Sequence, residues 1–163
     1  MDPAAIDSFL QVQKQIAGKP SWEPTLRADH YRLVWPITVD GEIRGPHLLL
    51  RYAAAAPRLI LSIGINVPPM VQRLDIDDAG GHNNGLRPPS GVPAGRIKGN
   101  NYHPWNVNRH LAGGRRLPRG LRFALPYDGP ESVEEAFSWF CKVSNIDPQG
   151  AVLPQLPPRG TLL

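Results

Sequence analysis

The 163-residue chain has a single cysteine, Cys141, so no internal disulfide can form. It also lacks an apolar stretch long enough to span a membrane, because the longest such run, residues 59–65, is strand-sized and interrupted by Ser62 and Gly64. The N-terminus has no basic segment followed by an apolar run, as a signal peptide would require. These absences predict a soluble cytoplasmic protein with no membrane partner.

Several catalytic motifs are missing as well. The chain has no G-x-x-x-x-G-K-[ST] phosphate loop and no strand-linked G-x-G-x-x-G, which argues against NTPases and nucleotide-dependent oxidoreductases. It has no G-x-S-x-G and no C-x-x-C, so serine hydrolases and thioredoxin-like proteins are also disfavoured. We therefore expect no cofactor.

Acidic residues are absent from residues 79–126, a run of forty-eight residues that contains eight Arg and Lys. This run holds His82, His103 and His110, many Gly and Asn, and follows an acidic cluster at residues 75–78. Such a basic surface suits an anionic partner, and a phosphate-bearing ligand, RNA before DNA, is the one we expect. The alternative is a solvated basic face that keeps the protein soluble.

Amphipathic patterns predict helices near both ends of the chain. Residues 2–17 begin with an aspartate cap followed by proline, and apolar residues recur at helical spacing. A second helix is predicted from Ser132, which precedes Glu135 at the capping-box spacing, and it ends before Pro148. Its apolar face includes Cys141, which we expect to be an inert thiol.

Between these helices the sequence predicts an antiparallel sheet. Its strands are residues 29–39, 42–52, 58–66, 71–76 and 121–125, with a hairpin turn at Asp40-Gly41 and a return to the sheet at residues 101–107. Residues 77–101 are predicted to form a long loop that is functional or mobile. The expected fold class is α+β, a curved antiparallel sheet flanked by N-terminal and C-terminal helices, in one domain over residues 1–146 with a proline-rich tail over 147–163.

His82 and His103 are the strongest candidates for catalysis, because both stand in a polar, glycine-rich context. In RNA cleavage one histidine can remove the 2′-hydroxyl proton while another protonates the leaving 5′-oxygen, without a metal. Asp75 is expected to orient a histidine, and a structural pair with Arg73 is the alternative. A second alternative is that both histidines are turn residues bonded to the backbone.

Cations and aromatic residues near these histidines are predicted to bind the substrate. A cation must offset the charge of the pentavalent phosphate, and aromatic rings can stack on bases. The predicted substrate-binding residues are Arg73, Arg96, Lys98, Asn100, Asn101, Tyr102, Trp105 and Arg109. Asp75, Asp77, His82 and His103 form a competing set of ligands for Mg²⁺, Mn²⁺ or Zn²⁺. Their spacing matches no dedicated metal motif, so we predict no metal site.

Short motifs recur in order between residues 73 and 146. They are Arg73-Leu74-Asp75, Gly81-His82, Gly99, His103, Trp105, Leu125-Pro126, Ala136-Phe137 and Asn145-Ile146. This order resembles a group of small prokaryotic proteins that are often encoded in toxin–antitoxin-like or mobile-element neighbourhoods. Their G-P-H-x-H motif is altered here, because Asn100 and Asn101 replace its Pro and inner His, so the H-x-H pair is not available.

The resemblance implies a shared fold and a site around Asp75, His82 and His103, and its genomic context favours RNA or nucleotide chemistry. We therefore predict an RNA- or phosphate-ligand-binding protein that acts as a metal-independent, toxin-type endoribonuclease and has an antitoxin as protein partner. The alternative is a non-enzymatic phage or mobile-element protein that binds or inhibits a protein or nucleic-acid partner through the basic loop. A third is a homo-oligomer assembled through a sheet edge and the tail.

Overall fold

The sheet at the centre of the protein has nine strands, seen here in a computed structural model that describes residues 1–53, 60–77, 80–113, 116–130 and 132–158. Its strands are β1 (Lys14–Ile16), β2 (Glu23–Pro24), β3 (His30–Val39), β4 (Glu42–Ala53), β5 (Ile60–Asn66), β6 (Met70–Asp77), β9 (Asn101–His103), β10 (Leu125–Pro126) and β11 (Ile146–Asp147). They follow the order β10-β9-β6-β5-β4-β3-β1-β11, with β2 beside β3, and only β1 and β11 pair in parallel among the described strands.

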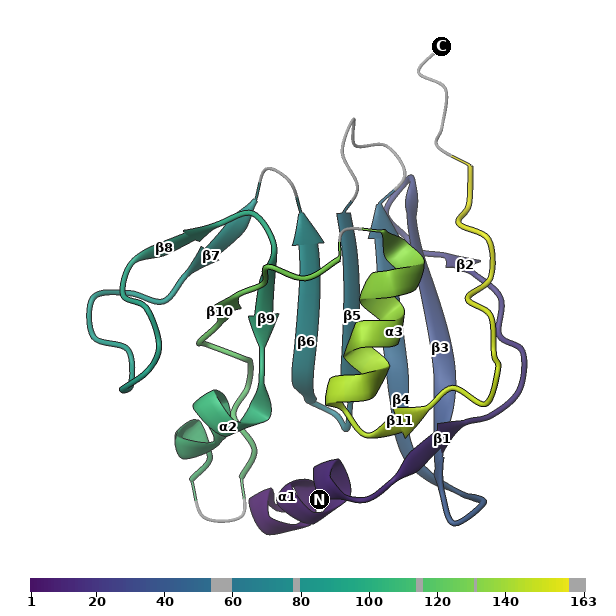
Figure 1. The fold of residues 1–163 in the computed structure, drawn as a ribbon, viewed down its shortest axis with the longest axis horizontal. Coiled ribbons are helices and arrows are strands. Elements are labelled where there is room, and N and C mark those ends of the chain that lie inside the picture. Colours follow the sequence, from purple (N-terminus) through teal and green to yellow (C-terminus); the bar gives the residue numbers. More distant parts are fainter. Residues whose placement is uncertain (54–59, 78–79, 114–115, 131, 159–163) are drawn as a thin grey trace.

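Three helices and a small hairpin complete the fold. The helices are α1 (Pro3–Gln11), α2 (Trp105–Asn108), which runs into the 3-10 turn η1 (Arg109–Leu111), and α3 (Val133–Val143). The hairpin pairs β7 (Gly81–Asn83) with β8 (Arg96–Lys98) and lies beside β9 (Figure 1). Helices at both ends of the chain and a mostly antiparallel sheet confirm the predicted α+β fold class. None of the described helices has the length and apolar character needed to cross a membrane.

The predicted β3–β4 hairpin is confirmed. Asp40 and Gly41 have φ angles of 53° and 78°, the left-handed conformation that a two-residue turn of this kind requires. The predicted strands 71–76 and 58–66 correspond to β6 and β5, although residues 58 and 59 lie outside the described residues.

The two faces of the central strands differ, because successive side chains point to opposite sides of a sheet. One face is apolar and buried beneath α3, which crosses the front of the sheet in Figure 1. There the Phe137 ring stacks on Trp35 with centroids 5.7 Å apart. Burial also raises the pKa of the Cys141 thiol to about 12, which fits the inert role expected for it.

The opposite side of β3, β4, β5, β6 and β9, which we name the open face, is defined by two rows of directly paired residues. The first row is Arg32, Arg51, Ser62, Asp75 and Asn101, and the second is Val34, Leu49, Gly64, Arg73 and His103. Most of these side chains remain at least partly exposed. Polar and charged groups from five strands therefore share one surface.

The N-terminal helix is shorter than the predicted range 2–17. Asp2 caps α1 as expected, with its carboxylate accepting from the Ala5 backbone N–H at 2.9 Å. The helix ends at Gln11 because the buried Lys14 ammonium binds the carbonyl oxygens of Phe9, Leu10 and Val12. Residues 14–16 then pair with β3 and β11 as a strand.

The segment 77–101 was predicted as a loop, and that prediction is wrong for part of its length, because it contains β7, β8 and the start of β9. The buried Asn84 holds it in place. Its amide donates to the carbonyls of Pro93 and Ala124 at 2.8 and 2.9 Å, and its oxygen accepts from the Ala124 N–H at 2.8 Å. These bonds tie the β7–β8 hairpin to the segment that leads into β10.

Further along the chain, the predictions hold in part. Residues 101–107 do return to the sheet, but only as the short β9 before α2 begins at Trp105. Of the predicted strand 121–125 only Leu125 is in β10, since buried Asn108 binds the backbone of Phe123 in both directions. The C-terminal helix begins as predicted, because the Ser132 hydroxyl accepts from the Glu135 N–H at 3.3 Å.

The segment predicted as a tail begins inside the sheet. Asp147 belongs to β11, which pairs with β1, so the sheet extends beyond residue 146. Leu153 is buried, and the Trp22 indole donates to the Pro154 carbonyl at 3.1 Å. At least residues 147–154 therefore pack against the body of the protein.

Candidate functional site

Four of the predicted site residues come together on the open face, and we name them the histidine cluster. Arg73 and Asp75 lie on β6, His103 lies opposite Arg73 on β9, and His82 reaches the group from β7. The rings of His82 and His103 meet edge to face with centroids 4.6 Å apart. Two histidines that stand twenty-one residues apart in the chain are thus direct neighbours.

Arg73 connects the acidic and basic members of the cluster. Its Nε donates to Asp75 Oδ2 at 2.8 Å, and its Nη2 lies 3.0 Å from His103 Nε2. A guanidinium can only donate, so His103 accepts through Nε2 and the neutral ring carries its proton on Nδ1. Protonation of His103 would place an N–H on Nε2, which is 3.4 Å from Asp75 Oδ2.

The remaining nitrogen of His103 is the least satisfied atom of the cluster. The His103 side chain is fully buried, and its Nδ1 has no hydrogen-bond partner among the described residues. The buried Asn101 Oδ1, two residues earlier on the same face of β9, also lacks a partner there. Buried polar atoms are normally paired, so these two unpaired atoms distinguish this part of the open face from the rest of the protein described here.

Burial and charge set the protonation of the cluster. Burial lowers the pKa of His103, and the charge of Arg73 acts in the same direction, against the effect of Asp75. Burial acts to raise the pKa of Asp75, but the charge of Arg73 and the Ser62 hydroxyl lower it, as does His103 when its ring is protonated and Nε2–H faces the carboxylate. The cluster therefore favours a neutral imidazole beside an ionised carboxylate.

His82 is the more accessible histidine, because its side chain is only partly buried. Its Nε2 lies 2.7 Å from the Arg122 carbonyl oxygen, which can only accept, so Nε2 carries the proton. The neutral ring then has its lone pair on Nδ1. This is the protonation state of a general base.

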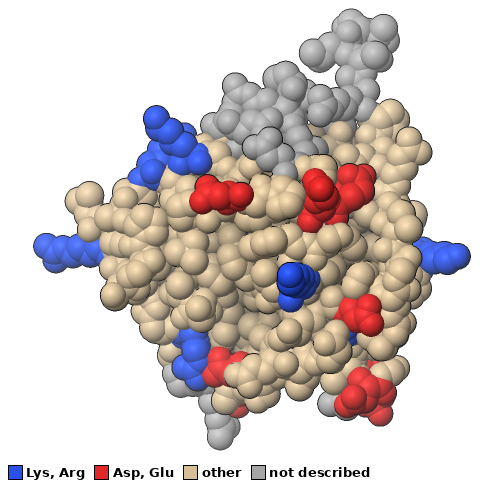
Figure 2. Space-filling view, in the orientation of Figure 1, with Lys and Arg blue, Asp and Glu red and all other residues tan. Residues whose placement is uncertain are grey.

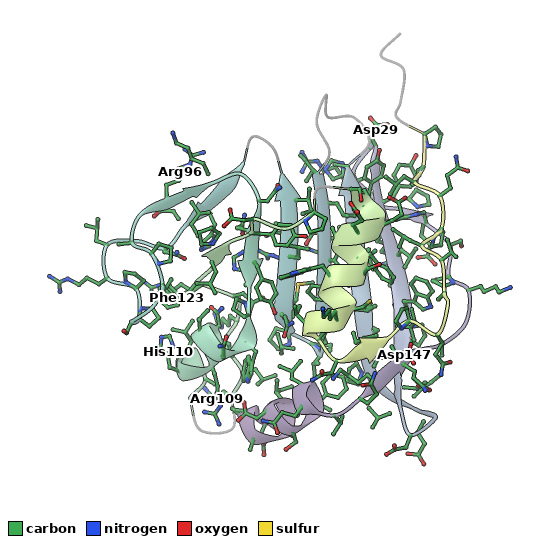
Figure 3. The ribbon with its side chains drawn as sticks, viewed as in Figure 1. Asp29, Arg96, Arg109, His110, Phe123 and Asp147 are labelled. Atoms are coloured by element: carbon green, nitrogen blue, oxygen red, sulfur yellow. The ribbon has the colours of Figure 1, made fainter. Side chains whose placement is uncertain are left out.

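Arg96 and Lys98 do not join the cluster, contrary to their predicted role as phosphate clamps beside the histidines. In the β7–β8 ladder His82 lies opposite the buried Ile97, whereas Arg96 lies opposite Asn83 and Lys98 opposite Gly81. Alternation along β8 therefore turns both cations to the other face of the hairpin. Figure 3 shows Arg96 projecting away from the body of the protein.

Trp105 and Arg109 are also separated from the histidines, because both bind Asp7 of α1. The Trp105 indole donates to Asp7 Oδ1 at 2.7 Å, and Arg109 Nη2 lies 2.6 Å from Oδ2. The hydrogen bonds from Arg109 and Trp105 lower the pKa of Asp7. Trp105 is buried, so the predicted stacking surface is instead a packing residue, and Figure 3 places Arg109 next to α1.

Tyr102 and the two asparagines differ in position. Tyr102 points to the α3 face, where its ring meets Trp139 edge to face at 5.0 Å, so it is not placed to stack on a base at the cluster. Asn101 lies on the open face opposite Asp75, where its amide donates to Gly99 O at 3.2 Å. The Asn100 carbonyl accepts from the Tyr127 N–H at 3.2 Å.

Over its described part, the surface on the α3 side has no continuous basic area that a polyanion would cover. Figure 2 shows Lys and Arg as separate groups among Asp and Glu over the described part of this face. Among the described side chains no group of three or more His, Cys, Asp and Glu could hold a metal ion, and the Asp77 side chain lies outside that description.

Sequence reasoning missed Ser62 and Arg51 as members of the polar surface. Both lie in regular alternation with buried residues of β4 and β5, and Ser62 is directly opposite Asp75. Alternation gives their face, but the cross-strand register that places them beside Asp75 is not evident from local sequence. Comparison of the chain with protein-family models, with curated proteins and with solved structures gave no match.

Proposed function

We propose that the protein binds RNA or another phosphate-bearing ligand at the histidine cluster, and that the cluster cleaves RNA without a metal ion. The observation that carries this proposal is the edge-to-face contact of His82 and His103 above the Arg73–Asp75 pair. Groups with perturbed pKa values, as Asp75 and His103 have, concentrate at catalytic sites.

The two rings offer the two proton positions that the reaction needs. His82 Nδ1, with its lone pair, takes the proton of the 2′-hydroxyl, whose oxygen attacks phosphorus. Donation to the leaving 5′-oxygen requires the protonated His103, which gives up its Nδ1 proton as the bond from that oxygen to phosphorus breaks and keeps Nε2–H toward Asp75. Arg73, whose side chain is 31% exposed, offsets charge on the phosphate, and Asp75 orients Arg73 and His103. The products would be a 2′,3′-cyclic phosphate and a 5′-hydroxyl.

The test is incubation of purified protein with single-stranded RNA in EDTA, followed by analysis of the RNA ends. We expect wild type to cleave, His82→Ala to lose about a hundredfold or more of the rate, and His110→Ala to retain it. His110 is the matched control, because it is exposed in the same basic run and stacks on Phe123 instead (Figure 3). Intact RNA with folded wild type would overturn the cleavage proposal.

A second candidate is the non-enzymatic binding protein. Full burial of the His103 side chain favours it, because a catalytic group must reach its substrate. This candidate predicts that wild type retains RNA or a partner protein without product formation. Filter binding of the same RNA, measured beside the cleavage assay, separates the two.

A further inference from the structure

Two arginines on neighbouring strands of the open face are placed so that their like charges repel each other. Arg32 on β3 and Arg51 on β4 are directly opposite each other. Like charges at such positions are destabilising. Glu23 compensates Arg32 through a contact of 3.1 Å, but within the described part of the chain no ion pair or hydrogen bond holds the Arg51 guanidinium.

These two arginines border a pocket of about 520 Å³, which is within the range of small-molecule sites. Arg27 adds a third guanidinium to its lining, whereas Leu49, Ala53 and Ile60 contribute apolar surface. No Asp or Glu is among the described residues that line it. The pocket therefore combines the unpaired positive charge of Arg51 with an apolar wall.

The pocket adjoins the histidine cluster through Ser62. This residue lines the pocket, lies directly opposite Arg51 on one side and Asp75 on the other, and its hydroxyl contributes to the low pKa of Asp75. Adjacent strands are about 4.8 Å apart, so Arg51 and Asp75 are separated by about 10 Å across β5. A ligand in the pocket would reach the edge of the cluster.

The chemistry of the lining selects the ligand. The planar guanidinium of arginine binds phosphate through two parallel hydrogen bonds, and it also stacks on nucleobases. An apolar wall adds nothing for a bare inorganic anion but suits the base of a nucleotide. We propose that this pocket binds a nucleoside phosphate, with the phosphate between Arg51 and Arg32 and the base against Leu49 and Ile60.

The same chemistry is present in a free nucleotide and in one nucleotide of an RNA strand. The inference shares its ligand class with the proposed function, but it does not require cleavage, because binding is measured directly. Isothermal titration with AMP, inorganic phosphate and a single-stranded RNA octamer tests it. We expect AMP or the octamer to bind, and inorganic phosphate to bind at least about tenfold more weakly.

The diagnostic variant is Arg51→Leu, and Arg96→Leu is its control. Both residues are exposed strand arginines and both changes remove one positive charge, but Arg96 is on the far face of the β7–β8 hairpin. Arg51→Leu should weaken binding about tenfold to a hundredfold, whereas Arg96→Leu should change it less than about twofold. Ile60→Glu, which places a carboxylate in the pocket, should abolish binding as a second test.

The outcomes separate clearly. Binding of AMP but not the octamer identifies a free nucleotide as the ligand, and binding of the octamer but not AMP identifies RNA, provided that Arg51→Leu weakens it. Absence of binding by both, or equal effects of Arg51→Leu and Arg96→Leu, would overturn the inference. If wild type binds the ligand in a manner that depends on Arg51 but does not cleave RNA, only the proposed catalytic function would be overturned.

Discussion

Arg73 donates a hydrogen bond to the fully buried His103, whose other ring nitrogen has no partner among the described residues. This contact holds a neutral imidazole within a sheet, between a cation and a carboxylate. Neutral imidazole is stable there only while Nε2 remains free to accept. Acidification should therefore act on folding through this residue.

The first prediction concerns that pH dependence. Burial lowers the pKa of His103 below its ordinary value of 6.5, so the unfolded chain binds the proton more tightly than the folded protein. The contribution of His103 to the free energy of unfolding has its full value above pH 6.5 and decreases as the pH falls below 6.5. In urea unfolding, the free energy of unfolding of wild type should decline as the pH is lowered from 8 to 5. The decline should be smaller in His103→Gln and the same as wild type in His110→Gln. An unchanged decline in His103→Gln would contradict this assignment.

Asn84 provides the second prediction, because it holds the β7–β8 hairpin to the rest of the chain. Asn84→Ala removes three hydrogen bonds from a buried site and leaves backbone groups unpaired, which should cost about 3 kcal/mol of unfolding free energy. Asn83→Ala is the matched control, since Asn83 is exposed and makes one local bond to the Gly85 N–H. Denaturant unfolding and amide exchange in β7 and β8 measure the effect, and similar losses in both variants would refute it.

A third prediction follows from the buried lysine at the end of α1. Burial lowers the pKa of Lys14 from 10.5 to about 8. Between these values the unfolded chain binds more protons than the folded protein, so the contribution of Lys14 to stability becomes more favourable as the pH rises from 8 to 10.5. Lys14→Met should lack this rise, while the exposed Lys19→Met keeps it. Unfolding free energies measured at pH 8 and 10 test the difference, and parallel curves for wild type and Lys14→Met would be inconsistent with it.

The fourth prediction separates packing from ligand binding at Trp105. Trp105→Phe removes the indole hydrogen bond to Asp7 from a buried position and should lower the unfolding free energy by about 1–2 kcal/mol. RNA and AMP affinities should remain within about twofold of wild type, since Trp105 lies away from the open face. Thermal unfolding and the titrations described above provide both measurements. A stable variant with weak RNA binding would restore Trp105 to the ligand site.

The long strands and the C-terminal helix were predictable from sequence for local reasons. Asp40-Gly41 supplies the turn conformation by itself, and Ser132 with Glu135 forms a cap within one turn of helix. The end of α1 was not predictable in this way. It depends on Lys14 turning back to three carbonyl oxygens, and apolar periodicity continues past that point in the sequence.

The same distinction between local and long-range determinants applies to the candidate site. Asp75, His82 and His103 stand out by their residue types and glycine-rich surroundings, and the structure brings them together. Closeness in sequence predicts that Arg96 and Lys98 lie with these residues, but the structure separates them. Their side chains alternate with Ile97 along β8, which is too short a strand to recognise in the sequence, and therefore point away from the histidine cluster. Sequence alone does not relate Arg51 to Asp75, because only the register across three strands does so.

The parallel pairing of β1 with β11 has a consequence for how the chain acquires its structure during synthesis. Lys14 on β1 lies opposite Ile146, and its backbone N–H is bonded to the Asn145 carbonyl at 2.8 Å. The Asn145 side chain also binds the Leu10 carbonyl at the end of α1. The segment 14–16 thus completes its contacts only after residues 145–147 have been synthesised. Until then β1 can pair only with β3, and its second edge stays open while most of the sheet is being made.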